Sequence, residues 1–375
     1  MRPVNAMPET AATTLSRRLL LRLAGVGSLG AAAFAATKAR GAAGGYGAGH
    51  RGARHDGAAD RHSGHLAGAV GRVTSLDPDP SVYLRSFNFS HLPEGERARY
   101  YRETPLSGPP DGRLLREYEI YAVDREIEIA PGLFFPAWTY NGQVPGPTLR
   151  ATEGDRVRVR FLNQGSHPHT IHFHGWHPPA MDGSMREHQV QPGAEFVYEF
   201  DAEPFGLHLY HCHAVPLKRH IHKGLYGAFI VDPPGGRPPA DELVMVMNAF
   251  DTNFDGDNEV YAVNTVAHHH LHAPVEVKVG ELVRVYVVNV TEFDLVNSFH
   301  LHGMFFDVFR TGTRLESSET TDTVMLCQGE RAILETRFRY PGPFMFHAHQ
   351  SEFAELGWMG FFSAREASAP VETPA

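Results

Sequence analysis

Residues 154–161 read Gly-Asp-Arg-Val-Arg-Val-Arg-Phe, so that apolar and charged side chains alternate along the stretch. This period of two is typical of a β-strand with one buried face. Residues 280–287 read Gly-Glu-Leu-Val-Arg-Val-Tyr-Val and repeat the pattern 126 positions later. The two stretches predict strands at equivalent places in two halves of the chain.

A histidine motif recurs in the same two halves. His-Cys-His at residues 211–213 is matched by His-Ala-His at residues 347–349, 136 positions later. A repeat of this length is a whole domain and not a solenoid unit. Proline and glycine between short alternating strands favour β-sandwiches over helical layers. We therefore predict an all-β protein with two sandwich domains, at residues 112–234 and 240–366.

Composition narrows the classes of function. The 375 residues include 34 Lys and Arg against 43 Asp and Glu, a net charge of −9. The first forty residues carry six basic groups against one acidic group, or +5, so the remainder carries −14. An acidic body argues against a nucleic-acid partner, and the lack of 18 consecutive apolar residues argues against an integral membrane segment. Only two cysteines against 24 histidines point to metal binding and not to a disulfide scaffold.

The ends of the chain differ from its body. Ser-Arg-Arg at residues 16–18, followed by small and apolar residues, gives residues 1–40 the look of a twin-arginine export signal, which predicts a periplasmic or extracellular protein. Residues 41–79 are rich in glycine and histidine with little to bury, so we predict a disordered linker. Residues 80–111 form an N-terminal extension whose aromatic side chains are expected to pack onto the first domain, and residues 367–375 form a tail.

Four His-x-His pairs are the main candidates for metal chemistry. The pairs are His172 with His174, His211 with His213, His300 with His302, and His347 with His349. Residues i and i+2 of a strand point to the same face, so each pair presents two imidazoles side by side. One such pair arises easily by chance, whereas four at matched positions of a repeat do not. Eight imidazoles are enough for a cluster of several metal ions.

Cys212 points to a second site. Because Cys212 stands between the two histidines of a pair, its thiol faces the opposite side of the strand. His169 stands three residues before His172, and this odd offset favours the side that Cys212 faces. His220 and His222 follow and are alternatives for a second imidazole. A thiolate with two imidazoles and a weak or absent axial ligand describes a blue electron-transfer copper. Cys327, in the stretch Met-Leu-Cys-Gln-Gly, is expected to be a buried small hydrophobe.

With these motifs, residues 112–366 resemble the multicopper oxidases. The matching motifs are Trp-Thr-Tyr-Asn-Gly-Gln-Val-Pro-Gly-Pro at 138–147, His-Phe-His-Gly at 172–175 followed by Asp-Gly at 182–183, His-Cys-His at 211–213, His-Leu-His-Gly at 300–303 and His-Ala-His at 347–349. The resemblance implies two cupredoxin-like Greek-key β-sandwich domains. It also implies four copper ions per chain: one type 1, one type 2 and a type 3 pair, the last three forming a trinuclear cluster.

The resemblance also assigns residues to each copper. For type 1 it implies His169, Cys212 and His220, with His222 as the alternative to His220 and Leu225 at the non-coordinating axial position. For type 2 it implies His172 and His300. For type 3 it implies His174, His211, His213, His302, His347 and His349. Asp182 matches an acid beside the cluster, and Glu352 or Glu355 is a candidate proton relay.

The second domain departs from the pattern of three-domain laccases. It has Ala348 where the type 1 cysteine belongs and Asn297 where the upstream histidine belongs. The resemblance therefore implies a type 1 site in the first domain, as in two-domain relatives. Those relatives resemble trimers in which the trinuclear cluster lies between chains, and a closed heterologous ring of this kind is physically reasonable.

The expected function is a laccase-like oxidase, which oxidises a reductant one electron at a time and reduces dioxygen to water. The reductant is open among phenols, aromatic amines, metal ions and a protein donor. One alternative is a copper nitrite reductase, but its mononuclear catalytic copper would leave the second histidine of each pair superfluous. Another is a non-catalytic copper carrier or electron-transfer protein, but the ten methionines are scattered and not clustered.

Overall fold

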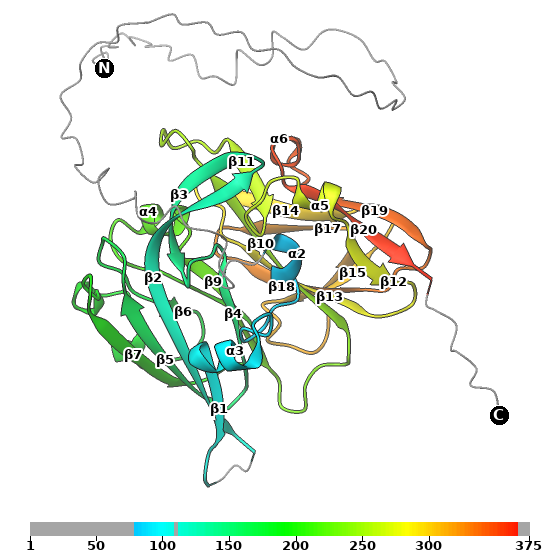
Figure 1. Cartoon of the computed structure of the whole chain (residues 1–375). Coiled ribbons are helices and arrows are strands. Elements are labelled where there is room, and N and C mark those ends of the chain that lie inside the picture. The colour runs from blue at the N-terminus through cyan, green and yellow to red at the C-terminus, as the bar shows by residue number, and fades with distance from the viewer. Residues whose placement is uncertain (1–78, 109–111, 367–375) are drawn as a thin grey trace, which may run out of the picture. The chain divides into compact units, whose positions relative to one another are not determined.

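The computed structural model describes residues 79–108 and 112–366, and strands dominate them (Figure 1). This confirms the predicted all-β class. The predicted export signal, nearly all of the predicted linker and the predicted C-terminal tail lie outside the described residues. The described helices are short: α2 (Pro80–Tyr83), α3 (Glu94–Tyr100), α4 (Leu217–His222), α5 (His269–His272), α6 (Ser351–Glu355) and the 3-10 turns η2 (Pro179–Met181) and η3 (Arg186–His188). None of the helices in these ranges is long and apolar enough to cross a membrane.

The first half of the chain folds into two sheets. One has the order β1-β2-β5-β7, with β3 also paired to β2, and consists of β1 (Tyr101–Pro105), β2 (Leu114–Ala130), β3 (Leu133–Tyr140), β5 (Arg156–Asn163) and β7 (Glu195–Asp201). The other has the order β4-β9-β8-β6 and consists of β4 (Gly146–Thr152), β9 (Tyr226–Asp232), β8 (Gly206–His211) and β6 (His172–Phe173). The second sheet carries two of the His-x-His pairs at its β6–β8 end.

The second half also folds into two sheets. One has the order β11-β10-β13-β18-β15-β16 and consists of β11 (Val260–Val263), β10 (Asp241–Phe250), β13 (Val283–Asn289), β18 (Arg331–Thr336), β15 (Phe306–Arg310) and β16 (Glu319–Thr321). The other has the order β12-β20-β19-β14-β17 and consists of β12 (Val275–Lys278), β20 (Met359–Arg365), β19 (Gly342–His347), β14 (Val296–Leu301) and β17 (Thr323–Cys327). The other two His-x-His pairs begin at the ends of β14 and β19, with His300 and His347 on the strands and His302 and His349 just beyond them.

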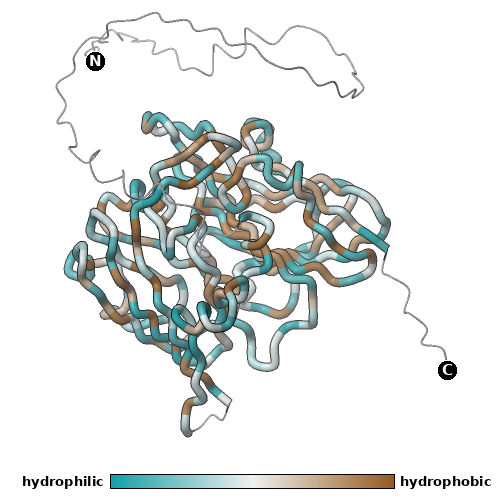
Figure 2. Tube along the Cα trace, in the orientation of Figure 1, coloured by the Kyte–Doolittle hydropathy of each residue, from teal (hydrophilic) through white to brown (hydrophobic). Residues whose placement is uncertain are grey.

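The alternating stretch at residues 154–161 forms β5, and its apolar members face inward. Val157, Val159 and Phe161 are buried, while Arg158 and Arg160 pair outward with glutamates of the neighbouring strands. The hydrophobic positions in Figure 2 follow the strands in the same way, with hydrophilic positions on the loops. Burial of one face thus explains why the pattern has a period of two.

Its counterpart in the second half, β13, is buried on both faces. Val283, Val285 and Val287 enter the core between the two sheets of the second half. Tyr286 and Val288 enter a second core, which contains side chains of β8 and β9 from the first half. The six-stranded sheet is therefore covered on one side by its own partner sheet and on the other by the first half, and this contact positions the candidate sites.

The N-terminal extension does not pack only where we expected. Phe89 and Tyr100 lie in the core of the first half, as predicted. Tyr83, in contrast, enters the core between the halves and donates a hydrogen bond to the Gly146 carbonyl at 3.0 Å. Leu84 is buried in the core of the second half. The extension therefore contacts both halves, because its apolar side chains are distributed between the three cores.

Candidate metal centres

Cys212, His169 and His220 meet at a buried point in the first half. The Cys212 Sγ lies 3.2 Å from His220 Nδ1 and 3.9 Å from His169 Nδ1, and the two nitrogens are 3.1 Å apart. All three side chains are buried. The His169 Nε2 is also buried, and the described residues offer it no hydrogen-bond partner. Both Nδ1 atoms therefore converge on the sulfur, and this donor set suits a soft metal ion such as copper.

Local structure brings these three residues together. Cys212 directly follows β8, and its N–H donates to the Leu225 carbonyl at 3.0 Å. His169 is held before β6 by two backbone hydrogen bonds with Val190. His220 comes from α4. Leu225 is fully buried in the same core as Cys212, and its apolar side chain offers no ligand atom.

Burial sets the protonation of this cluster. It lowers the pKa of His169 to about 3, helped by the neighbouring His220, and lowers the pKa of His220 to about 4. Both imidazoles are therefore neutral near neutral pH, as metal binding requires. Burial raises the pKa of the Cys212 thiol to about 11, although the Thr170 N–H donates to its sulfur at 3.4 Å. A bound cation is then needed to favour the thiolate.

His222, the alternative to His220, lies elsewhere. Its Nε2 accepts a hydrogen bond from the Asp251 N–H at 2.9 Å. Its ring packs against Phe135 and Phe293, with centroids 5.4 Å and 4.9 Å away. Of the two histidines, the structure brings His220 to Cys212.

The expectation that Cys327 is a buried hydrophobe is wrong. Cys327 is exposed at the end of β17. This edge strand pairs only with β14, and its burial alternates. Val324 and Leu326 take the inward positions, so Cys327 faces outward.

Four histidines gather at the end of the β4-β9-β8-β6 sheet; we refer to His172, His174, His211 and His213 as the first quartet. His172 and His211 are directly opposed in the β6–β8 register. The His174 Nε2 lies 3.2 Å from the His211 Nε2. The other nitrogens are anchored, because His172 Nδ1 donates to the Asp182 carbonyl at 2.8 Å and His211 Nδ1 donates to the Cys212 carbonyl at 3.0 Å. Their Nε2 atoms are therefore free to bind metal.

The second half repeats this arrangement with His300, His302, His347 and His349, the second quartet. His300 Nδ1 donates to the Asp322 carbonyl at 2.8 Å and His347 Nδ1 to the Ala348 carbonyl at 2.6 Å. The His302 Nε2 lies 2.9 Å from the His347 Nε2. Unlike every member of the first quartet, His302 and His349 are exposed. The second quartet therefore has the same anchoring but an open face.

The two quartets do not meet within one chain. In residues 79–108 and 112–366, several groups of three side chains have ligand atoms within 4.8 Å of one another. No such group contains histidines from both quartets. The first quartet lines a cavity of about 720 Å³, whose other lining includes Val290 and residues 292–295 and 328–329 of the second half. The second quartet is not part of that lining. Among the described residues, the two quartets therefore form two separate histidine clusters.

The three predicted acids differ in their positions. The Asp182 carboxylate lies 3.2 Å from His172 Nδ1 and accepts a hydrogen bond from the Ser184 hydroxyl. Burial raises its pKa, but the hydrogen bond from Ser184 and the charge of His172 outweigh burial and lower it overall. Glu352 and Glu355 are exposed on α6, and none of the described hydrogen bonds joins either of them to a quartet.

Sequence reasoning missed two residues at the first quartet. His177 lies 3.7 Å from the Asp182 carboxylate through its Nε2. Arg331, on β18 of the second half, donates to His174 Nδ1 at 3.4 Å and to the Leu207 carbonyl at 3.0 Å. The proximity of His177 to His172 and His174 in sequence is a weak signal for the first. Arg331 reaches the quartet only through the packing of the two halves, so no local pattern marks it.

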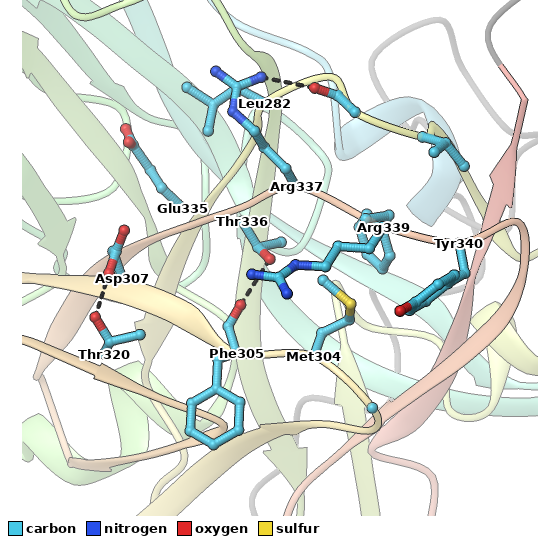
Figure 3. A pocket seen from close by; sticks show the side chains of 14 residues that line it. Leu282, Met304, Phe305, Asp307, Thr320, Glu335, Thr336, Arg337, Arg339 and Tyr340 are labelled. Atoms are coloured by element: carbon cyan, nitrogen blue, oxygen red, sulfur yellow. Dashed lines mark hydrogen bonds between the residues drawn. The ribbon is translucent and has the colours of Figure 1, made fainter.

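Another cavity, of about 810 Å³, lies in the second half, and none of the histidines of the second quartet lines it (Figure 3). Gly303, which follows His302, lines it together with Met304, Phe305 and Tyr340. Phe305 and Tyr340 are exposed, and the Thr336 hydroxyl donates to the Phe305 carbonyl at 2.8 Å. This cavity is therefore lined by exposed aromatic side chains.

The chain combines two β-sandwiches with a buried thiol beside two imidazoles and with two histidine quartets. These features define a copper oxidoreductase of the cupredoxin type. Family models described as multicopper oxidase match residues 125–236 and residues 237–368. The chain belongs to the multicopper oxidase family.

Similar proteins agree on the copper-protein class but carry different names. A crystal structure titled multicopper oxidase is 55% identical, with a TM-score of 0.72, and the match covers 78% of this chain and all of that one. A copper-containing nitrite reductase of Neisseria meningitidis is 32% identical over 248 residues, which are 60% of this chain and 63% of that protein. Laccase 1 of Metarhizium majus is 40% identical over 102 residues, 26% of this chain and 16% of that protein. The chain thus spans less than two thirds of these curated relatives.

Proposed function

We propose that the protein is a laccase-like oxidase, which couples one-electron oxidation of a reductant to four-electron reduction of dioxygen to water. The observation that carries this proposal is the completeness of both quartets. In each quartet, neighbouring imidazole rings have centroids 4.8 Å to 5.9 Å apart. A mononuclear catalytic site would need only some of these histidines.

The residues fit four copper ions. The type 1 ion would be held by His169, Cys212 and His220, and the apolar Leu225 in the same core would not be a ligand. The type 2 ion would be held by His172 and His300, and the type 3 pair by His174, His211, His213, His302, His347 and His349. Copper bound there supplies one-electron transfer and the four-electron reduction of dioxygen. His213 supports this fit, because its buried Nδ1 has no hydrogen-bond partner among the described residues.

The chain itself supplies the connection between the two kinds of site. Cys212 is covalently adjacent to His211 and to His213, so the backbone would offer two short routes between a copper held by the thiolate and copper held by these histidines. The Asp182 carbonyl fixes the ring of His172, and its carboxylate stays ionised beside that ring. Buried neutral imidazoles at His174 and His211, whose pKa values burial lowers to about 2 and about 4, leave their nitrogens available to metal.

We further propose a homotrimer, in which the first quartet of one chain faces the second quartet of its neighbour. The separation of the quartets within one chain supports this assembly. Exposed apolar side chains flank both half-sites: Trp176 and Val215, 68% and 76% exposed, beside the first, and Phe305, 62% exposed, beside the second. Large exposed apolar groups of this kind are typical of protein interfaces. A heterologous contact repeated three times closes a ring.

The same proposal covers location and partners. Export through a twin-arginine signal to the periplasm or the extracellular space remains a prediction from residues 1–40. The partners are dioxygen and an unidentified reducing substrate, without nucleic acid and without an integral membrane segment. The reductant is a phenol, an aromatic amine, a metal ion or a protein donor.

Copper nitrite reduction is the second candidate function. The relative from Neisseria meningitidis favours it, since a protein of that name matches 60% of this chain at 32% identity. Such an enzyme would bind two coppers per chain and turn over nitrite.

Copper stoichiometry and turnover distinguish the two candidates. We expect four coppers per chain, a blue absorption band and oxygen uptake with a phenolic reductant, in a particle with the sedimentation mass of a trimer. Cys212→Ser should abolish the blue band and retain the other three coppers. Cys327→Ser is the matched control, because the second cysteine is exposed on β17, and it should keep all four. Two coppers per chain with nitrite turnover would support the reductase instead.

A further inference from the structure

A buried carboxyl group shares the cavity of the first quartet. Glu292 lies in the loop between β13 and β14 and lines the cavity of about 720 Å³ that the four histidines of the first quartet also line. Its side chain is only 7% exposed. A cavity of this size holds many water molecules. Glu292 is therefore connected to the first quartet by solvent space within one chain, although it comes from the second half.

The surroundings of Glu292 keep its proton available. Gln328 is its hydrogen-bond partner, and Lys218 of α4, whose ammonium lies 4.0 Å above the Phe293 ring, is the cation that acts on it. Burial raises the pKa of the Glu292 carboxyl, against the opposing effects of these two side chains. The other ionisable groups around it are the quartet histidines, Tyr226 of β9 and Asp294 of its own loop.

The other two carboxyl groups beside the first quartet are engaged differently. Asp294 accepts hydrogen bonds from the Tyr261 hydroxyl at 2.6 Å and from Asn258 Nδ2 at 2.9 Å. Asp182 accepts from Ser184 and lies against His172, and its pKa is lowered. The surroundings of Asp182 stabilise a carboxylate, which is an acceptor and not a proton donor, and both donors at Asp294 bind its Oδ2. Of the carboxyl groups lining the cavity or contacting the quartet, Glu292 has the surroundings of an acid.

We propose that Glu292 is the proton-relay residue for dioxygen reduction at the first quartet. This inference rests on the proposed oxidase function. Each dioxygen takes four electrons and four protons to give two waters, and the electrons come one at a time from the reductant. Glu292 transfers one proton at a time through cavity water toward the quartet. It then regains a proton from solvent at the mouth of the cavity, where Leu295 is exposed.

Three variants of the copper-loaded enzyme test the relay. Glu292→Gln keeps the size and the hydrogen-bonding capacity but removes the exchangeable proton. Glu292→Asp keeps the acid. Asp294→Asn, in the same loop and lining the same cavity, is the matched control. The measurements are copper content, anaerobic bleaching of the blue band, and the rate at which oxygen reoxidises the fully reduced enzyme between pH 5 and pH 9.

Glu292→Gln should keep four coppers and the wild-type bleaching rate, while reoxidation slows about 10-fold to 100-fold and its rate loses the wild-type pH profile. Glu292→Asp should restore most of the rate, and Asp294→Asn should stay within about 2-fold of the wild type. A wild-type rate and pH profile in Glu292→Gln would overturn the relay alone. Equal losses in Asp294→Asn would also overturn it, in favour of a structural effect of the loop. A wild-type enzyme that takes up no oxygen would overturn the proposed oxidase and the relay together.

Discussion

His220 and His222 provide a paired test of the proposed type 1 site, because they share their helix, their burial and the direction and size of their pKa shift. Both lie on α4, 3% and 4% exposed, and burial lowers the pKa of each to about 4. They differ in their partners: His220 Nδ1 approaches the Cys212 sulfur, and His222 Nε2 accepts from the Asp251 N–H. We expect His220→Ala to abolish the blue band and His222→Ala to retain it.

The cost of His222→Ala can be worked from its contacts. The substitution leaves the buried Asp251 N–H without its acceptor, which costs about 1–3 kcal/mol. It also removes a ring packed against Phe135 and Phe293, which costs about 2 kcal/mol for a buried side chain of this size. The free energy of unfolding should therefore fall by about 3–5 kcal/mol. His222→Gln retains an acceptor and part of the volume, so it should fall by only about 1–2 kcal/mol.

Denaturant unfolding of the copper-free protein measures the stability, and the visible spectrum after copper loading measures the site. His220→Ala also loses a buried ring, which packs on Trp138 with centroids 4.8 Å apart. Its stability should therefore fall by a similar packing cost of about 2 kcal/mol, so that colour and not stability separates the two variants. The assignment is wrong if the colour disappears with His222 and survives the loss of His220. The stability reasoning is wrong if His222→Ala loses less than about 1 kcal/mol.

Two further predictions concern pH and the axial position. Burial lowers the pKa of His208, His222 and His270 to about 4. Below pH 6.5 the unfolded chain therefore binds more protons than the folded one. The free energy of unfolding then decreases as the pH falls toward 4. For each of these histidines the copper-free protein should lose about 2 kcal/mol between pH 7 and pH 5; thermal unfolding across this range checks it, and a flat profile would contradict it. Leu225→Met places a thioether beside Cys212, which should lower the reduction potential of the blue site in a redox titration; an unchanged potential would show that this side chain does not face the metal.

Local patterns predicted the parts of the fold that depend on neighbours in sequence. The alternation at residues 154–161 predicted β5 because only one face of that strand is buried. The matching stretch in the second half predicted β13, but not that Arg284 is buried within it, where it pairs with Glu242 and Glu335 at 2.9 Å and 2.6 Å. The first half of the protein covers that face of the sheet, and such a contact leaves no periodic signal in the sequence.

In the candidate sites, too, local sequence predicts some features, and others depend on the packing of the two halves. The i, i+2 rule places the rings of His172 and His174 side by side, and parity places Cys212 on the other face, since both depend only on strand geometry. Cys327 was wrongly expected to be buried, because apolar neighbours do not reveal which positions of an edge strand face solvent. Arg331 and Glu292 reach the first quartet from the second half, so only the packing of the two halves reveals them.

The separation of the two quartets within each chain has a genetic consequence. In the proposed ring, every reaction centre takes one half from each of two neighbouring polypeptides. A chain disabled only in its first quartet and a chain disabled only in its second quartet are then each inactive alone. Co-assembled in equal amounts, they should rebuild about one centre in four, so that two defective alleles would complement one another.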